Sequence, residues 1–391
     1  MLRLLGKGWL APLFVSPAYH FSYPGLGWVR PLPSPFMQAA VVALAAAALA
    51  VAAGWRTRAW AAVLAVGLAY LEAIDRALYL NHYYLAGLLA ALLVLLAPRT
   101  ATVPAWALAA FRVQVGAVYV FAGLAKLNRD WLLHAQPLRA WLASRADLPI
   151  VGPWLERPAV AFAASWAGAG FDLAIVPLLL WRRTRWWAFG GVVAFHLATG
   201  LLFPIGMFPF IMTAAATLLL PPDWPRRLRI ARAAADPPRP EPTPRGEERV
   251  VVPGLVAVHL VVQLLLPLRQ HLAAVPSAWT GRGFNFAWNV MVAERSGSVL
   301  LNVVDRASGR RETVRPARDL TAIQEAAMAQ DPELIVVWAR DVARAWRREG
   351  RVVAIYADAW ASLNGRPGRR LLDPNVDLTT AVEPPVLPWT D

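Results

Sequence analysis

The chain of 391 residues contains no cysteine. This absence excludes disulfide bonds, a thiolate nucleophile and zinc sites built from cysteine ligands. Lysine is almost absent too, because Lys7 and Lys126 are the only lysines among 39 basic residues. Arginine keeps its charge under almost any condition, whereas a desolvated lysine can lose its proton and act as a base. The two lysines are therefore the first residues to consider for proton chemistry.

Charged residues are also scarce. Only 16% of the residues are charged, whereas 58% are hydrophobic. Several apolar stretches approach the roughly 20 residues that cross a bilayer. The sequence therefore predicts an all-α polytopic membrane bundle of about eight transmembrane helices, followed by a small α+β extramembrane domain. The predicted spans are residues 36–54, 57–79, 81–97, 105–127, 159–181, 185–203, 205–220 and 250–268.

The net charge of +14 comes largely from arginines in short loops between these spans. The loops carry Arg56 and Arg58, Arg99, the arginines of 182–185 and those of 226–232. They alternate consistently along the chain, so the positive-inside rule makes them cytoplasmic and turns the C-terminal domain outward. Basic residues are not interleaved with aromatics as in a base-stacking surface, so nucleic acid is not an expected partner. An integral protein of a bacterial inner membrane with an extracytoplasmic C-terminal domain is expected.

Composition divides the chain into three parts. Residues 1–35, rich in proline, glycine and aromatics, predict an interfacial segment. Residues 36–268 form the predicted transmembrane domain, in which the proline-rich stretch 236–249 reads as a cytoplasmic linker. Residues 269–391 form the predicted α+β domain. Its pattern predicts a hairpin of residues 298–305 and 310–314, helix within 319–348 and a strand at 352–362.

Ionisable residues inside apolar spans are candidates for function, because burying them in a membrane is costly. Lys126 ends the fourth predicted span, His82 begins the third, and His196 lies within the sixth. On the predicted topology all three lie in the outer half of the bilayer and converge on one cavity. Simpler interpretations are a lysine reaching the interface, a helix-capping histidine and a hydrogen-bonded histidine of the bundle. Asp172, in the middle of the fifth span, is expected to pair with a polar neighbour.

Several familiar sites are missing from the sequence. No spacing of histidines and carboxylates indicates a metal, and neither a glycine-rich phosphate loop nor a serine nucleophile elbow is present. What remains is a lysine base with histidines in an apolar cavity that opens outward. This combination suits proton abstraction from a lipid-soluble substrate, because apolar walls would protect a reactive anion from water.

Two segments resemble motifs of a known family. Residues 81–85, Asn-His-Tyr-Tyr-Leu, resemble the Asn-His-x-Tyr-Leu segment of the vitamin K-dependent γ-glutamyl carboxylase family. Residues 121–131, Phe-Ala-Gly-Leu-Ala-Lys-Leu-Asn-Arg-Asp-Trp, resemble its Ala-Gly-x-x-Lys-Leu-x-x-Asp-Trp motif. Further similar segments follow in the same order at residues 206–208, 222–226, 286–292, 358–364 and 372–377. Together they resemble a compact bacterial member, of the type also called the HTTM domain.

The resemblance implies a reaction. In this family a lysine deprotonates vitamin K hydroquinone, and O2 converts the ring to an epoxide through a strongly basic alkoxide. That base removes a γ-proton from a peptide glutamate, and the carbanion takes up CO2. The implied class is a carbon–carbon lyase with a monooxygenase-like half-reaction. It needs reduced vitamin K (phylloquinol or menaquinol), O2 and CO2, but no metal. The implied partners are membrane lipids, the quinol and a secreted peptide or protein that contains glutamate.

The resemblance also assigns residues. It implies catalytic roles for Lys126 and His82. It implies substrate or quinone binding by Asn81, His196, Trp288, Met291 and His271.

The sequence departs from the family at several positions. Animal members carry a second lysine just before the base, where this chain has Ala125. Many members have a histidine three residues after the proline of a Leu-Pro pair, where this chain has Gln270, followed by His271. Two alternatives therefore stay open: a quinol epoxidase or oxidoreductase without carboxylation, and a non-catalytic membrane protein that binds a quinone or lipid. A base should not tolerate Lys126→Arg, whereas a binding protein should.

Overall fold

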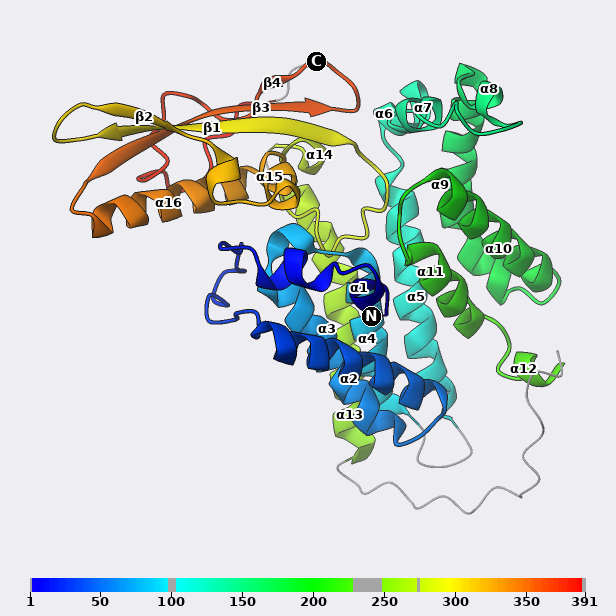
Figure 1. Ribbon diagram of the computed structural model, residues 1–391. Helices are drawn as coiled ribbons and strands as arrows, with labels where there is room; N and C mark the ends of the chain where they lie inside the picture. The colour runs from blue at the N-terminus through cyan, green and yellow to red at the C-terminus, as the bar shows by residue number, and fades with distance from the viewer. Residues whose placement is uncertain (1, 98–102, 228–247, 273–274, 389–391) are drawn as a thin grey trace.

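The computed structural model describes residues 2–97, 103–227, 248–272 and 275–388. They form a mostly helical structure in which a bundle of helices carries a small antiparallel sheet at one end (Figure 1). The long bundle helices are α2 (Ser34–Ala52), α3 (Thr57–Ile74), α4 (Asn81–Leu96), α5 (Ala105–Ala125), α9 (Pro158–Leu180), α10 (Arg185–Leu202) and α13 (Glu248–Leu265). The shorter α11 (Phe208–Ala216) packs against α10. The predicted linker 236–249 lies almost wholly outside the described residues.

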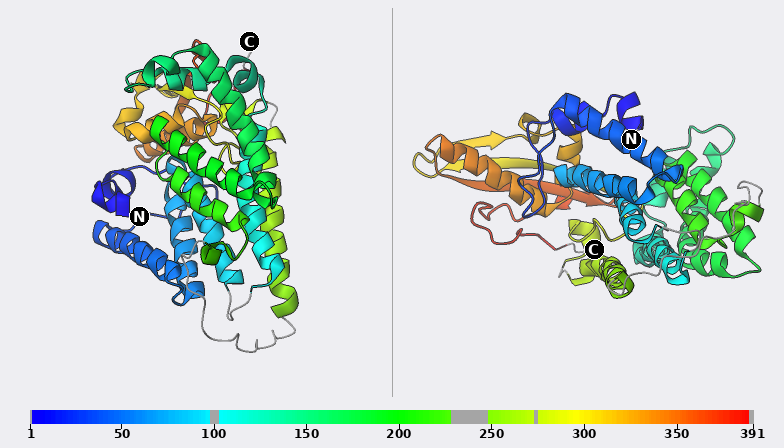
Figure 2. Two further views of the ribbon diagram at one scale, coloured as in Figure 1. Left: turned by 90° about the vertical axis from the view of Figure 1, so that its right-hand side faces the viewer. Right: turned by 90° about the horizontal axis from the view of Figure 1, so that it is seen from below.

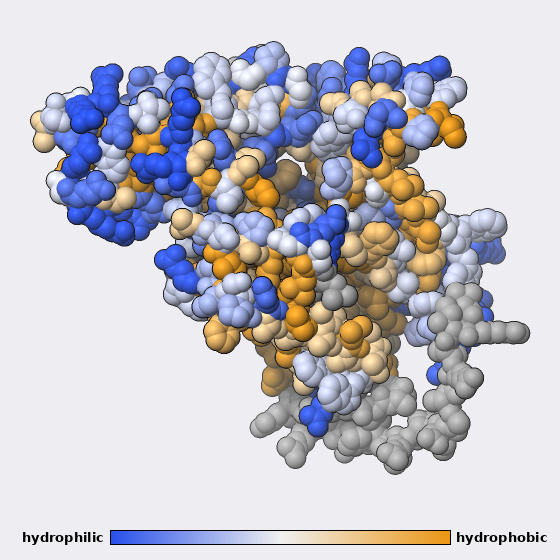
Figure 3. Space-filling view, in the orientation of Figure 1, coloured by the Kyte–Doolittle hydropathy of each residue, from blue (hydrophilic) through white to orange (hydrophobic). Residues whose placement is uncertain are grey.

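Five described helices are long and apolar enough to cross a membrane. They are Ser34–Ala52, Thr57–Ile74, Ala105–Ala125, Pro158–Leu180 and the continuous helical stretch Val250–Leu272. A helix lies in each of the eight predicted spans, but the count of about eight transmembrane helices is not confirmed. Two of the predicted spans became shorter apolar helices, Asn81–Leu96 and Phe208–Leu219. The chain is nevertheless an integral membrane protein by these helices and by the hydrophobic surface over them (Figure 3).

The sheet confirms the predicted α+β region. Its strands are β1 (Arg295–Asp305), β2 (Arg311–Val314), β3 (Val353–Leu363) and β4 (Arg369–Arg370), in the order β2-β1-β3-β4. All neighbours are antiparallel. The alternation in β1 buries one face of the sheet, and helices α15 (Ala322–Met328) and α16 (Pro332–Arg348) cover that face. Hydrophilic residues dominate the surface of this region (Figure 3).

The C-terminal region sits at the same end of the bundle as three short helices (Figures 1 and 2). These are α6 (Arg129–His134), α7 (Leu138–Ala143) and α8 (Gly152–Leu155). Asp130 of α6 accepts hydrogen bonds from Arg366, at 2.5 and 2.7 Å, and from Asn364, at 2.6 Å. The Arg366 guanidinium is the main reason that the pKa of Asp130 is lowered from its ordinary value. This ion pair fastens the loop after β3 to the helix that directly follows Lys126.

The N-terminal segment forms a second connection between the helical bundle and the C-terminal sheet region. It contains α1 (Leu2–Gly6) and η1 (Ala11–Val15), which lie between α2 and the C-terminal region (Figures 1 and 2). The Tyr19 hydroxyl donates to Asp341 Oδ2 at 2.6 Å, and Gln324 Nε2 donates both to the Tyr19 carbonyl and to Asp75 Oδ2. These bonds hold the sheet region against the bundle.

Candidate functional site

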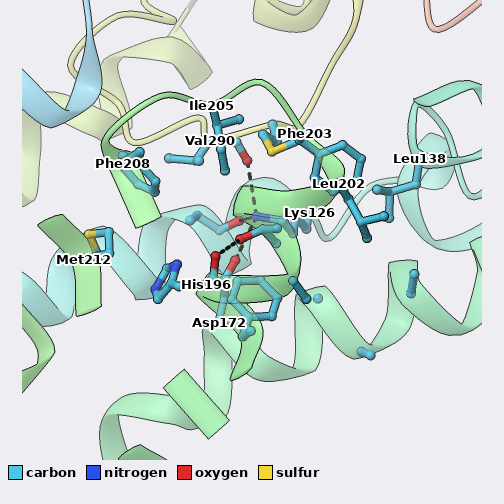
Figure 4. A pocket seen from close by; sticks show the side chains of 18 of the residues that line it. Lys126, Leu138, Asp172, His196, Leu202, Phe203, Ile205, Phe208, Met212 and Val290 are labelled. Atoms are coloured by element: carbon cyan, nitrogen blue, oxygen red, sulfur yellow. Dashed lines mark hydrogen bonds and ion pairs between the residues drawn. The ribbon is translucent and has the colours of Figure 1, made fainter. Parts of the chain in front are cut away.

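An apolar cavity of about 240 Å³ opens between α5, α9, α10 and α11 (Figure 4). The Lys126 amine and the Asp172 carboxylate lie in its wall, and His196 lies on a neighbouring helix. Most of the remaining wall is aliphatic or aromatic. The apolar lining includes Val118, Leu138, Leu142, Phe195, Leu202, Phe203, Ile205, Phe208, Met212 and Met291.

Lys126 stands at the end of α5, and its side chain is almost fully buried. Its Nζ donates to Asp172 Oδ2 at 2.8 Å, to the Ala122 carbonyl at 3.1 Å and to the Val290 carbonyl at 3.3 Å. An ammonium group has three N–H donors, so these acceptors satisfy all of them. The amine also lies 5.3 Å from the centre of the Trp131 ring. The surroundings of the amine are therefore those that an ammonium group requires.

Close packing of α5 and α9 brings the ion pair together. A Cβ placed on Gly123 would lie 2.8 Å from Leu173 Cδ2 and 3.1 Å from the Leu173 backbone nitrogen. Any larger residue would therefore have to push Leu173 away, and glycine is common where membrane helices approach this closely. Beyond Lys126 the Asn128 side chain accepts from Trp131 N and caps α6. The end of α5 is fixed from both directions.

Asp172 is the main residue that sequence reasoning did not assign to the site. It was expected to pair with a polar neighbour, and that neighbour is Lys126 itself. Both side chains are largely shielded from solvent, at 7% and 6% exposed. Opposite charges within apolar spans tend to pair with one another, so the presence of both residues in apolar spans was the sequence signal for this pair. The sequence did not reveal the partner, because the residues are 46 positions apart and meet only in the folded bundle.

The third acceptor comes from a strained stretch of backbone. Phe286, Trp288 and Met291 have φ values of 62°, 57° and 53°, although none of them is glycine. Bulky residues rarely adopt this left-handed conformation, and it persists only where the surroundings impose it. Stacking of Trp288 on Tyr84, with ring centres 5.2 Å apart, is one such restraint. The stretch 286–291 aims the Val290 carbonyl at Lys126.

His196 shares the cavity with Lys126. It is buried, and its Nε2 lies 3.1 Å from the Tyr119 hydroxyl. The hydrogen-bonded interpretation of this histidine therefore holds, and the side chain also lines the cavity. Either partner can donate in this pair, depending on the tautomer of the ring.

Asn81 and His82 line a second, larger cavity of about 710 Å³. The two cavities adjoin, because both are bordered by Ile205, Phe208, Val290 and Met291. The structure thus divides the predicted site: Lys126 and His196 face one cavity, His82 faces the next, and Met291 stands between them.

Two of the remaining predicted residues lie outside both cavities. Trp288 is fully buried against Tyr84 and supports the strained stretch from behind. His271 is exposed on η4 (Leu266–Leu272). Its neighbour Gln270 points inward instead, where its Oε1 accepts from Asn289 Nδ2 at 2.7 Å. The helical turn of η4 can present only one of the two adjacent residues to the interior, and that residue is Gln270.

Comparison with known families gives two adjoining matches. A model of the HTTM domain matches residues 1–224. A model described as the vitamin K-dependent gamma-carboxylase lumenal domain matches residues 248–386. No solved structure matches the chain. Among the described residues no group of three or more histidine, aspartate or glutamate side chains is placed to hold a metal ion.

Proposed function

The chain belongs to the vitamin K-dependent gamma-carboxylase family, and we propose that it is a membrane enzyme that couples quinol epoxidation by O2 to carboxylation of peptide glutamate. The observation that carries the proposal is the buried amine of Lys126 in the wall of an apolar cavity. This lysine occupies the position of the family base in the segment 121–131. Lys7, the only other lysine in the chain, lines neither cavity.

The chemistry of the cavity suits a reduced vitamin K. Its walls are mostly apolar, which suits a fused aromatic ring, and only a few polar side chains line them. Lys126 and the Tyr119–His196 pair are the groups that would meet the quinol hydroxyls. Bound reduced vitamin K supplies the oxygen-dependent step that yields an epoxide and a base strong enough for a carbon acid. Menaquinol or phylloquinol both carry this ring.

Lys126 can act as a base only after its own proton has moved. Asp172 Oδ2 lies 2.8 Å from Nζ and is placed to accept that proton. Apolar surroundings ease this transfer, because they penalise the two charges that it removes. The bond from Nζ to the Val290 carbonyl is the longest of the three, at 3.3 Å, so it is the easiest to exchange for a quinol hydroxyl. The amine would then take the hydroxyl proton at Nζ.

Exclusion of water follows from the lining. Phe203, Ile205 and Phe208 of the α10–α11 connection close the cavity beside Lys126 (Figure 4). A reactive anion formed there would be screened from bulk water, which would otherwise quench it. The same apolar lining also suits contact with an isoprenoid or phytyl tail.

A second candidate function is quinol epoxidation without carboxylation. The division of the site favours it, because Asn81 and His82 line the second cavity and not the cavity of Lys126. Quinol chemistry at Lys126 would then not require a peptide in the second cavity.

The test is a quinol assay on the purified protein in detergent. Reduced vitamin K, O2, carbon-labelled bicarbonate and a glutamate peptide would be supplied to wild type, Lys126→Ala, Lys126→Arg and the control Lys7→Arg. We expect epoxide and labelled peptide from wild type and Lys7→Arg, and neither from the Lys126 variants. Epoxide without labelled peptide would select the second candidate. Full activity in Lys126→Arg would reject the lysine as the base.

We further propose that the protein lies in a bacterial inner membrane with the sheet region outside. The support is the distribution of arginines in alternate loops. Because the chain has no cysteine, single cysteines report the side directly. Ser308→Cys in the turn after β1 should react with an impermeant reagent in intact cells, whereas Arg183→Cys should react only after lysis. The reverse pattern would contradict this orientation.

A further inference from the structure

The second cavity carries positive charge without a matching negative one. Among the described residues, its wall contains Arg3 and His82, together with Asn81 and two tyrosines, but no aspartate or glutamate. The N-terminal segment supplies the permanent charge, because it closes one side of this cavity with Arg3 and Leu4 of α1, Leu13 of η1 and Trp9 between the two helices. A cavity of this kind attracts an anion.

The position of Arg3 is defined by two contacts. Its guanidinium lies 5.0 Å from the centre of the Trp9 ring. Its Nη1 would lie 3.6 Å from a Cβ placed on Gly206, so it rests against the loop that joins α10 to α11. Within the described part of the chain no hydrogen bond or ion pair joins Arg3 to a carboxylate. Arg3 is exposed, so the donors of its guanidinium can exchange water for a ligand.

The loop beneath Arg3 is also part of the cavity that holds Lys126. Ile205 lines both cavities, and so does Val290, whose carbonyl accepts from the Lys126 amine. A side chain held at Arg3 by its charged end would therefore lie next to the partition between the two cavities. The reacting quinol lies on the other side of that partition in the proposed function.

We propose that Arg3 binds the carboxylate of the substrate glutamate, an assignment that rests on the proposed function. A guanidinium and a carboxylate match in a bidentate pair, which fixes direction as well as position. Removing a proton from the carbon next to a carboxylate places a second negative charge beside the first. The guanidinium lowers the free energy of that dianion more than that of the resting substrate, so it favours proton removal. The product carries a second carboxylate, to which the same fork can also bind.

The test compares Arg3→Gln and Arg3→Lys with the control Lys7→Gln. Lys7 belongs to the same segment and also lies over Trp9, at 5.3 Å, but lines neither cavity. Binding of a fluorescent glutamate peptide and of its glutamine counterpart would be measured for each purified protein. Thermal unfolding midpoints would confirm that the variants are folded.

We expect wild type and Lys7→Gln to prefer the glutamate peptide. In Arg3→Gln the preference should fall about tenfold or more, the amount expected for a hydrogen-bonded charge pair. Arg3→Lys should recover part of it. In turnover, Arg3→Gln should raise KM for the peptide and should lower the rate of carboxylation more than the rate of epoxide formation. An unchanged preference in Arg3→Gln, or a wild type that does not distinguish the peptides, would overturn the proposal. Absence of epoxide formation in wild type would instead overturn the proposed function. The binding measurement does not depend on that activity.

Discussion

The ion pair of Lys126 and Asp172 gives the sharpest energetic prediction. Asp172→Asn keeps the size of the side chain but removes its charge, leaving the lysine without its counter-charge. At an effective dielectric constant of about 20, two unit charges 2.8 Å apart attract by about 6 kcal/mol. Desolvation of two buried charges offsets much of this gain. Removal of one partner should therefore destabilise the protein by about 3–5 kcal/mol, because it strands a buried charge.

A double-mutant cycle separates this pair from the general effects of substitution. The variants are Asp172→Asn, Lys126→Met and the double variant, and the measurement is the free energy of unfolding in detergent. We expect the double variant to be more stable than the sum of the two single effects predicts, by at least about 2 kcal/mol. Asp223→Asn is the matched control, because Asp223 forms an exposed pair with Arg227 at the same 2.8 Å distance. It should change stability far less than Asp172→Asn does, because solvent screens the exposed pair.

Two results would refute the reasoning. Additive effects in the cycle would mean that the two charges do not interact in the folded protein. A loss in Asp172→Asn no greater than in Asp223→Asn would mean that Lys126 rests as a neutral amine. The latter result would also remove the need for Asp172 to accept a proton before Lys126 acts as a base.

Two further predictions follow from the packing around the site. Gly123→Ala should destabilise the protein by about 1–3 kcal/mol and lower quinol turnover, because the added Cβ would press on Leu173. The control Gly170→Ala should do neither, because a Cβ there would have no neighbouring atom within 4 Å. Equal unfolding midpoints for the two variants would contradict this prediction. Because the pKa of Asp130 is lowered in the folded protein, its bond to Arg366 stabilises the fold at pH values above the ordinary pKa of 3.8, and this stabilisation is lost as the pH falls below 3.8. The loss of thermal stability on acidification should therefore be smaller in Asp130→Asn than in wild type. An unchanged pH profile in Asp130→Asn would argue against this prediction.

The strands of the C-terminal region were predictable because their pattern is local. β1 alternates between buried and exposed residues, and Asp305 closes the turn by accepting from the backbone of Ala307 and Ser308. The membrane helices were also predictable, because hydropathy is a local pattern, but the residues at which they end were not. The predicted span 57–79 stops as a helix at Ile74, because the next residue, Asp75, is extended and accepts from Gln324 of the distant α15. Hydropathy counts apolar residues and does not register such long-range bonds.

The site shows the same division. Lys126 stood out in the sequence because lysine is so rare, and the family motif pointed to the same residue. Asp172 and Arg3 did not stand out, since their importance depends on which helices and loops they meet. The separation of His82 from Lys126 was likewise invisible, because both lie near the same end of their helices. The sequence predicts how far along the bundle axis a residue lies, but not which neighbouring helices its side chain faces.

The three acceptors around the Lys126 amine come from different parts of the chain. Ala122 lies one turn back on α5, Asp172 lies on α9, and Val290 belongs to the strained stretch that leads into β1. The first two fall within the HTTM match and the third within the lumenal-domain match. The surroundings of the amine are therefore complete only when both matched regions are folded together. A displacement of the stretch 286–291 by a ligand in the second cavity would change the bonding of the amine directly, because Val290 borders both cavities. On the proposed function, a glutamate side chain in the second cavity would thus affect Lys126 through a single backbone carbonyl.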